Sequence, residues 1–473
     1  MTTEDAEAAQ AQPQPSAQQL DRGITLSYAL GSVGTAGFST VPGLLLAYYL
    51  TNSLGVAAGI AALVLLLPKA WDVVFLPLVG SWSDRYLEHH GNRRRFLLAG
   101  ALLLPPLFAL MFAVPAGAST AVATAWVFVA FLGAASAFAL FQVPYIATPA
   151  EITDSPQART TLMAWRVGML SFGILLFGAG SPALRDSFAD AATGYLVMGI
   201  VVGALIGLGM LACWWGLRRA TVRRSPESRP SLRQQFDAAR RSTDFTSLLG
   251  TFAIQALATS AMLAGIPYFA TYILHRPGIS DVLFVCLVAP AIIFVPMWAK
   301  VARRRGKKRG YQAASVMFMA GALALLAAPM LPLPVVLVLV AACGCGYAGM
   351  QMFPLAMLPD TIAADAAARG RAQAGAFTGY WTAGETLGFA IGPSLALAVL
   401  SVTGFVSARA GTVAEQPASA VTGVLLAFTV LPVALMLISL LFLRRYGGPP
   451  LTEADVPRLP PTTENAPTTE EPT

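Results

Sequence analysis

The chain has 473 residues, of which 56% are hydrophobic and only 12% are charged, and its mean hydropathy is +0.64. A soluble domain carries about twice that share of charge, and apolar runs of roughly 20 residues recur along the whole chain. This composition excludes a large soluble enzyme and predicts an all-α integral membrane protein. The formal net charge of +7 would suggest nucleic acid in a soluble protein. Here the basic residues lie in short loops between apolar runs, so we expect the lipid bilayer as a partner and no nucleic acid.

The two ends of the chain are polar. We expect disordered cytoplasmic tails at 1–22 and 444–473, and no cleaved signal peptide, because the first residues lack a basic region followed by an apolar one. Between the tails the apolar runs predict twelve transmembrane helices. Their expected ranges are 26–50, 58–82, 96–115, 120–144, 162–181, 194–217, 246–273, 281–299, 311–330, 334–357, 375–402 and 420–443.

The basic residues predict the orientation. With both termini cytoplasmic, 26 of the 31 lysines and arginines fall in cytoplasmic segments and three fall in outer loops. This is the bias that basic loops show toward the cytoplasm. We therefore expect a multi-pass protein of the inner or plasma membrane with both termini inside.

The two halves of the chain repeat. Pro144 and Pro149 near the end of the fourth span match Pro354 and Pro359 near the end of the tenth, at an offset of 210. Two similar halves joined by a basic loop are the plan of a secondary transporter. The expected units are an N-terminal six-helix bundle (23–217), a basic cytoplasmic linker (218–245) and a C-terminal six-helix bundle (246–443).

The cysteines and histidines do not indicate a metal or redox site. The four cysteines lie inside predicted spans, where they act as small packing residues. The sequence contains no nucleotide-binding loop, no cluster of metal ligands and no nucleophile beside a base. We expect no enzymatic activity, no metal and no cofactor.

A lysine and an aspartate lie inside the second apolar run. Lys69 and Asp72 are three residues apart, so a helix places them on one face. Charges at this depth are costly, and they face a cavity or each other. The pair is either a structural ion pair or a coupling site in which protonation of Asp72 frees Lys69.

The loop after this run carries a motif. Gly80-x-x-x-Asp84-Arg85 followed by Gly91-x-Arg93-Arg94 resembles the cytoplasmic loop motif of the major facilitator superfamily. We expect Gly80 to permit close helix approach, and Asp84 and Arg85 to pair across the two bundles. The expected cytoplasmic gate comprises Gly80, Asp84, Arg85, Arg93 and Arg94. The alternative is a basic loop that only sets the topology.

A closer resemblance extends over residues 24–443. Lys69-Ala70-Trp71-Asp72, followed by Pro77, Gly80 and Asp84, resembles the second helix of the glycoside–pentoside–hexuronide:cation symporter family. Val143-Pro144-Tyr145 and the stretch from Pro359 to Asp365 fit the same family. The resemblance implies a cation-coupled symporter with twelve helices in two bundles.

The resemblance implies a role for Asp72 in binding the coupling cation. The second acid of that site falls at Leu76 and is absent. Sodium needs several oxygen ligands, whereas one carboxylate can carry a proton. We expect proton coupling before sodium coupling, with uncoupled transport also open. Glu385, near the position of a family lysine, is a second proton carrier or an acid that only tunes polarity, and the expected coupling residues are Asp72, Lys69 and Glu385.

The substrate contacts are also expected from the resemblance. Arg166 matches a family arginine of the substrate cavity, and its alternative role is that of a buried partner for Asp72. Arginine suits sugar hydroxyls, carboxylates or phosphates. Ala36 and Gln142 stand where sugar-transporting members carry acids, which argues against a galactoside held by two carboxylates. The expected contacts are Arg166, Gln142, Trp381, Tyr380 and Tyr145, and ordinary packing is the alternative for each aromatic residue.

These observations lead to three hypotheses. The first is a monomeric, proton-coupled symporter that moves a small organic solute, such as a sugar or glycoside, by alternating access. The second is an exporter of amphipathic compounds such as lysolipids or drugs. The third is a membrane sensor that does not transport, which no appended soluble domain supports.

Overall fold

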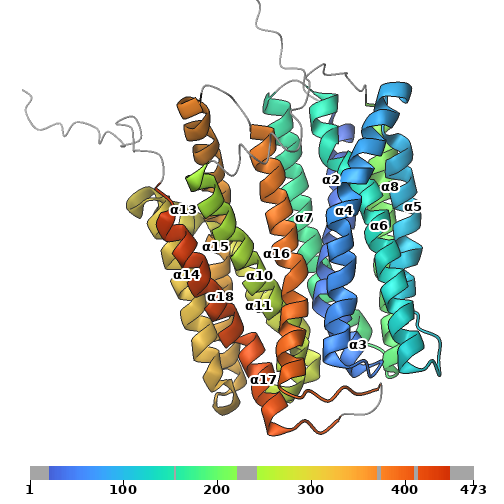
Figure 1. Cartoon of the computed structure of the whole chain (residues 1–473), viewed down its shortest axis with the longest axis vertical. Coiled ribbons are helices and arrows are strands. Elements are labelled where there is room, and N and C mark those ends of the chain that lie inside the picture. The colour runs from blue at the N-terminus through green and yellow to red at the C-terminus, as the bar shows by residue number, and fades with distance from the viewer. Residues whose placement is uncertain (1–20, 154–155, 221–241, 370–373, 410–413, 448–473) are drawn as a thin grey trace, which may run out of the picture.

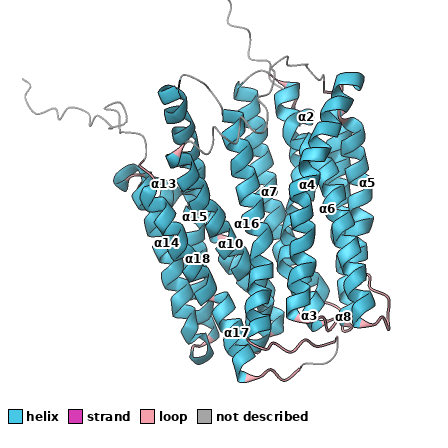
Figure 2. Ribbon diagram, viewed as in Figure 1, coloured by secondary structure: helices cyan, strands magenta, loops and turns pink. Residues whose placement is uncertain are grey.

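The computed structural model describes residues 21–153, 156–220, 242–369, 374–409 and 414–447. Long helices run side by side through the molecule and are joined by short loops (Figure 1). Among the described residues, extended pairing is limited to one isolated bridge, so the fold is all-α (Figure 2). Eleven of the described helices are long and apolar enough to cross a membrane.

The first half of the chain forms six long helical runs, the first of which contains a π-helical turn, η1. The runs are α2 (Arg22–Val41) with η1 (Pro42–Leu46) and α3 (Ala47–Asn52), α4 (Ala58–His90), α5 (Arg94–Met111), α6 (Thr120–Ile152), α7 (Pro156–Asp186) and α8 (Ala191–Leu217).

The second half repeats this order. Its elements are α10 (Thr243–Tyr268) with the π-helical turn η2 (Phe269–Ile273), η3 (Pro277–Ile279), α11 (Ser280–Val288), α12 (Pro290–Ile293), α13 (Val295–Arg305), α14 (Lys307–Ala324), η4 (Leu325–Met330), α15 (Leu333–Arg369), α16 (Ala374–Val402), α17 (Ala418–Phe428) and α18 (Val430–Arg445).

The expected span at 281–299 is a broken helix. It consists of α11, α12 and α13, with interruptions beside Pro290 and Pro296. Proline lacks a backbone N–H and crowds the preceding turn, which accounts for breaks at these points. For this reason the run is not among the eleven long apolar helices, and the count of twelve spanning helices stays a prediction.

The helices form two sets. In the first set α2 packs against α7 and α8, and α5 packs against α6 and α8. In the second set α10 packs against α16 and α18, and α14 packs against α15. The two sets, here called the N-terminal and C-terminal bundles, meet mainly where α4 contacts α16 and where α7 contacts α11.

Small residues line the close helix contacts within a bundle, as α16 and α10 of the C-terminal bundle show. Gly384, Gly388 and Gly392 recur every four residues along α16 and face α10. A Cβ at Gly388 would lie 2.5 Å from the carbonyl oxygen of Ala253. The absence of side chains lets the two backbones approach closely, which is how helices associate where water provides no driving force.

The two ends of the molecule differ in chemistry. The basic end holds the starts of α2, α5 and α14 and the ends of α4, α8 and α18, with residues such as Arg93, Lys307 and Arg444. The opposite end, here called the tyrosine end, holds α3 and η2 with Tyr48, Tyr268 and Tyr272. The first and the last residue that the structure describes both lie at the basic end of the molecule (Figure 1, top).

Several helices are longer than the expected spans. The apolar run that predicted 58–82 continues as helix to His90, where Gly91 adopts a φ of 70° and caps it. Likewise α6 continues to Ile152 and α15 to Arg369. Hydropathy marks only the part of a helix that contacts lipid, so polar extensions escape it. Most of the expected tails and linker lie outside the described residues, and Arg444 and Arg445 belong to α18.

Candidate functional site

A lysine and an aspartate face each other inside α4, near the middle of the helix. The Nζ of Lys69 lies 3.6 Å from Oδ2 of Asp72. The Asp72 side chain is 12% exposed and the Lys69 side chain 20%, so solvent screens the pair weakly. The two residues that the sequence singled out therefore form an ion pair within the bundle, while their part in coupling stays a prediction.

Two aromatic rings complete the surroundings of the lysine. The Nζ of Lys69 lies 5.3 Å from the ring centre of Phe38 on α2 and 5.7 Å from that of Phe131 on α6. The face of an aromatic ring attracts a cation, and more strongly where water is scarce. Leu76, one turn beyond Asp72, supplies no oxygen. The described residues contain no group of three or more metal-ligating His, Cys, Asp or Glu side chains, and the choice between proton and sodium stays a prediction.

Arg166 on α7 lies against an aromatic ring of α6. Its guanidinium carbon is 5.5 Å from the ring centre of Tyr145, and one of its nitrogens is 3.9 Å from the sulfur of Met163. Neither contact neutralises the charge. The arginine is thus held in place by an aromatic face while its hydrogen-bond donors stay suited to a negatively charged group.

Tyr145 is fixed on all sides. Its hydroxyl donates to the carbonyl of Tyr28 at 2.9 Å and lies 2.9 Å from Oγ of Ser32. Its ring stacks on that of Tyr28 with centres 4.6 Å apart. The residue is fully buried. Tyr145 was expected to touch substrate, but in this conformation it orients Arg166 and joins α6 to α2.

Gln142 lies one turn before Tyr145 on the same helix. Its Oε1 accepts a hydrogen bond of 2.9 Å from Oγ1 of Thr35 on α2. The side chain is half-buried. The amide nitrogen can still donate to a ligand, so the expected contact stays a prediction.

Glu385 on α16 lies within electrostatic range of Arg166 on the other bundle. Tyr347 on α15 lies near the same carboxylate. The sequence grouped Glu385 with Lys69 and Asp72 as a coupling site. The ion pair of Lys69 and Asp72 lies within α4, whereas Glu385 is in electrostatic range of Arg166 across the bundles. The expected part of Glu385 in coupling stays a prediction.

Trp381 is packed inside the C-terminal bundle. Its ring stacks on Phe252 of α10 with centres 4.5 Å apart, and only 3% of the residue is exposed. Its indole nitrogen is buried, and no partner for it lies among the described residues. Tyr380 is half-buried beside it. Stacking on Phe252 leaves Trp381 no free face for a ligand in this conformation, and its expected role stays a prediction.

A second polar site joins three helices at the basic end. Arg93 at the start of α5 donates to Glu151 at 2.8 Å and to Ser83 at 2.6 Å, and also binds Asp84. Only 5% of its side chain is exposed. These partners lie at the ends of α4 and α6. Arg93 therefore ties together helices of one bundle, and the expected pairing of Asp84 and Arg85 across the bundles stays a prediction.

The other expected gate residues have local roles. Among the described residues, a Cβ at Gly80 would meet only Val143, at 3.9 Å, so the close helix approach expected there is not seen in this conformation. Arg85 is exposed, and its carbonyl contacts His89. Arg94 donates to the carbonyl of Ala220 beyond the end of α8, at 3.2 Å. Ser83 and Glu151 were not predicted as gate residues, although an acid at the end of the fourth span was a visible signal.

The second half carries a related contact. Lys307 at the start of α14 lies 2.5 Å from Oδ2 of Asp360 near the end of α15, and it also donates to the carbonyl of Ala356. A basic residue that starts the third span of each half thus binds an acid near the end of the fourth. This agrees with the repeat seen in the sequence.

At the tyrosine end the two bundles are joined by hydroxyl groups. Tyr48 and Thr271 lie 3.0 Å apart, Thr51 and Tyr268 lie 2.7 Å apart, and Asn52 donates to Tyr272. The N-terminal members follow η1, and the C-terminal ones lie in or beside η2. Sequence reasoning missed this cluster, because tyrosines near span ends are also typical interface anchors.

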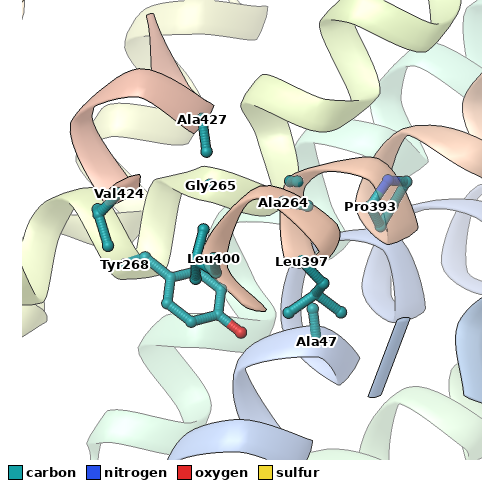
Figure 3. A pocket seen from close by; sticks show the side chains of 10 residues that line it. Ala47, Ala264, Gly265, Tyr268, Pro393, Leu397, Leu400, Val424 and Ala427 are labelled. Carbon is teal, nitrogen blue, oxygen red and sulfur yellow. The ribbon is translucent and has the colours of Figure 1, made fainter. Parts of the chain in front are cut away.

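A small enclosed space lies next to these contacts, on the side of the molecule's interior. It has a volume of about 10 Å³ and lies between Ala47, Tyr268 and Leu397, with the Tyr268 ring along one side (Figure 3). That volume holds about one water molecule. This space is too small for an organic solute, and the hydroxyl contacts beside it hold the two bundles together at the tyrosine end in this conformation.

Comparison with protein families gives one match that spans most of the chain. Residues 27–448 match the family model described as MFS/sugar transport protein. An uncharacterized symporter, YnaJ of Bacillus subtilis, is 26% identical over 87% of this chain and 88% of its own length. A glucuronide carrier protein homolog of Escherichia coli is 24% identical over 92% of this chain and 94% of its own length.

A solved structure supports the fold. A bacterial homolog of the human lysosomal transporter Spinster, in an inward-facing and unoccupied conformation, superposes with a TM-score of 0.60 at 15% identity. The likeness covers 90% of this chain and 95% of that one. At this identity the comparison concerns the arrangement of helices alone.

Proposed function

Because the chain belongs to the MFS/sugar transport protein family, we propose that it is a secondary transporter that moves a small acidic sugar or glycoside together with a proton. The basic end would face the cytoplasm, as the distribution of lysine and arginine favours. The bundles would rock about the site between them, and the described conformation would be the one closed to the outside.

The ion pair of Lys69 and Asp72 carries the proposal of proton coupling. It is a weakly solvated pair in the middle of a spanning helix, where charges are retained for a function or a mutual partner. Protonation of Asp72 would remove the partner of Lys69 and leave the ammonium held only by two rings. Such a change in charge gives the two access states different energies, which coupling requires.

The surroundings of Arg166 support an acidic substrate. The described contacts of its guanidinium are an aromatic face and a thioether, and its electrostatic partner Glu385 lies on the opposite bundle. A substrate carboxylate can take two parallel hydrogen bonds from an arginine, which gives both strength and direction. The name of the E. coli relative refers to a glucuronide, an acidic sugar of this class.

Uptake into proteoliposomes tests the proposal. Vesicles containing the protein receive a labelled glucuronide or the matching neutral glucoside, under an imposed pH gradient or an imposed sodium gradient. We expect glucuronide accumulation that follows the pH gradient and collapses with a protonophore. Accumulation that follows the sodium gradient at fixed pH would show that sodium, not the proton, is the coupling cation. Equal uptake of the glucoside would show that an acidic group on the substrate is not required.

An exporter of amphipathic compounds is the second candidate. One observation favours it: an apolar groove of about 450 Å³ on α2 and α8, lined by Leu208, Leu211 and Trp215. The groove belongs to one bundle and does not involve Arg166 or Asp72. A lysolipid included in the same vesicle experiment decides between the two candidates.

A further inference from the structure

A short segment of the C-terminal bundle crosses onto the N-terminal bundle at the tyrosine end. The crossing segment, Phe405–Arg409, follows α16, and Figure 1 shows this part of the chain at its lower edge near α3. The backbone N–H of Ala408 donates to the carbonyl of Thr51 at 2.8 Å, and Ser407 Oγ donates to the carbonyl of Val56 at 2.7 Å.

Two further contacts extend this attachment. Arg409 pairs with Leu54 as an isolated antiparallel bridge and donates to Oγ1 of Thr120, at the start of α6, at 3.3 Å. The segment therefore binds the ends of two spans of the opposite bundle through backbone groups as well as side chains. Backbone bonds of this kind fix the register of two chains.

The end of α16 is built to direct the segment outward. Gly404 has a φ of 80°, and its N–H bonds to the carbonyl of Ser401, while the N–H of Phe405 bonds to that of Leu400. These two bonds and the left-handed glycine form a Schellman cap. The cap ends the helix at a defined residue and so fixes the direction in which Phe405 leaves it.

The receiving loop fits the segment closely. Gly55 has a φ of 69°, and a Cβ built there would lie 3.2 Å from Cγ of Arg409. Within the C-terminal bundle, the side-chain amide of Gln416 holds the start of the crossing segment. It accepts a hydrogen bond from the N–H of Val406 at 2.9 Å and donates one to the carbonyl of Val406 at 2.7 Å. The crossing segment is therefore held by Gln416 within its own bundle while it fits closely against Gly55 of the other bundle.

The crossing segment is continuous with the hydroxyl cluster that joins the bundles. The Phe405 ring lies edge to face against Tyr268 and Tyr272, with centres 5.5 Å and 5.4 Å away. These tyrosines bond to Thr51 and Asn52 of the other bundle. Opening of the tyrosine end must therefore break the hydroxyl contacts and detach the segment together.

We propose that Phe405–Arg409 is a latch between the two bundles that sets how readily the tyrosine end opens. The segment docks on the rim formed by Thr51, Leu54, Val56 and Thr120, and its release is a required step of the opening. The proposal rests on the proposed function in one respect: it takes the opening to be part of a transport cycle.

A reporter cysteine measures the opening without any substrate. Ala47 is fully buried and lines the small closed space, so Ala47→Cys reacts with a maleimide only when the tyrosine end opens. Of the four native cysteines, three are buried and Cys286 is half-buried. The parent chain without the reporter, labelled in parallel, gives the background of these native thiols.

A cross-link tests the attachment directly. The variant Leu54→Cys with Arg409→Cys places two thiols opposite each other in the bridge, a spacing that a disulfide can span. Once oxidised, the pair is expected to slow labelling of the reporter at least about tenfold, and reduction is expected to restore it. Unchanged labelling of a fully cross-linked protein would overturn the latch.

Weakening the latch gives the opposite effect. Ser407→Ala removes one bond between the bundles, and Gln416→Ala removes the amide that holds the start of the segment; each is expected to raise the labelling rate about two- to tenfold, as the loss of one hydrogen bond predicts. Ser187→Ala is the matched control, because the one bond that Ser187 Oγ makes to a described residue is to the carbonyl of Leu184, in its own turn at the end of α7. Rates for Ser407→Ala and Gln416→Ala equal to that of the control would contradict the proposal.

The two proposals can fail separately. If the latch variants change the labelling rate while no acidic sugar is taken up, the proposed function is wrong and the latch stands. If acidic sugar uptake follows the pH gradient while labelling ignores every latch variant, the latch is wrong and the function stands.

Discussion

Arg93 and Glu151 form an ion pair of 2.8 Å that is buried where α5 begins and α6 ends, whereas the related pair of Lys307 and Asp360 in the second half is about 40% exposed. The two halves of the repeat thus contain equivalent ion pairs, one of them buried and the other exposed to water. The difference leads to the first prediction.

Arg93→Ala is expected to lower the free energy of unfolding by about 3 kcal/mol, because it leaves Glu151 buried without its cation. Lys307→Ala is expected to cost at most about 1 kcal/mol, because water screens an exposed pair. Denaturant or thermal unfolding in detergent measures both. Equal losses for the two variants would show that burial does not decide the strength of these contacts.

The second prediction concerns Asp72. Asp72→Asn keeps the size and polarity of the side chain but can no longer ionise, so we expect it to abolish accumulation driven by a pH gradient while exchange of solute across the membrane continues. Asp281→Asn is the control, since Asp281 is half-buried in the first turn of α11 and accepts a hydrogen bond from the N–H of Val282. Accumulation at the parent level in Asp72→Asn would remove the coupling role.

Lys69 and Asp72 should also be coupled in stability. A double-mutant cycle with Lys69→Gln and Asp72→Asn is expected to give an interaction energy of about 1–2 kcal/mol, with the double variant more stable than the sum of the single losses implies. Each single change leaves one charge without its partner in a poorly solvated place. Strictly additive melting temperatures would mean that the 3.6 Å pair contributes nothing.

The fourth prediction concerns the shape of the Arg166 head group. Arg166→Lys keeps the charge but loses the planar group that lies over Tyr145 and can hold a carboxylate through two bonds. We expect KM for a glucuronide to rise about tenfold or more, corresponding to roughly 1.4 kcal/mol, with little change for a neutral glucoside. A parallel loss for both sugars would point to a structural role.

Two glycines of α7 offer a matched pair at the bundle interface. A Cβ at Gly178 would lie 2.0 Å from the ring of Phe284 on the opposite bundle, whereas a Cβ at Gly180 would meet no described residue within 4 Å. Gly178→Ala is expected to disfavour the described conformation and to speed labelling at the tyrosine end. Gly180→Ala should leave labelling unchanged and stabilise the helix by up to about 1 kcal/mol. Identical labelling rates in the two variants would show that the contact between Gly178 and Phe284 does not affect opening of the tyrosine end.

The hydropathy pattern predicted most of the fold. Every expected span overlaps helix, because burial in lipid demands long apolar runs and internal hydrogen bonds. Two spans were drawn wrongly: α5 ends at Met111 within the expected 96–115, and 281–299 is interrupted. The pattern could not predict the break at Pro290 and Pro296, since prolines such as Pro68 and Pro77 stand inside an unbroken α4. Whether a proline interrupts a helix depends on how neighbouring helices satisfy the freed carbonyls.

The sequence singled out the individual residues of the site, but among their pairings it predicted only the one that lies within a single helix. Spacing alone placed Lys69 beside Asp72, since both lie on one helix. It could not place Glu385 in electrostatic range of Arg166, because the separation of these residues depends on how two bundles meet. The same reason explains why Trp381 was expected to be free for a ligand although it lies against Phe252, and why the hydroxyl contacts at the tyrosine end were missed.

The π-helical turns η1 and η2 have a consequence for the register of the chain. Both interrupt the first span of their half, directly before or within the residues that join the bundles. A π-turn accommodates one residue more than an α-turn. If either turn reverted to α-helical bonding, the residues beyond it would rotate by about 100°. Thr51 and Asn52, which follow η1, would then turn away from their partners, and Tyr272 would shift with the turn η2 that contains it. The contacts between the bundles at this end thus depend on one surplus residue in each half of the repeat.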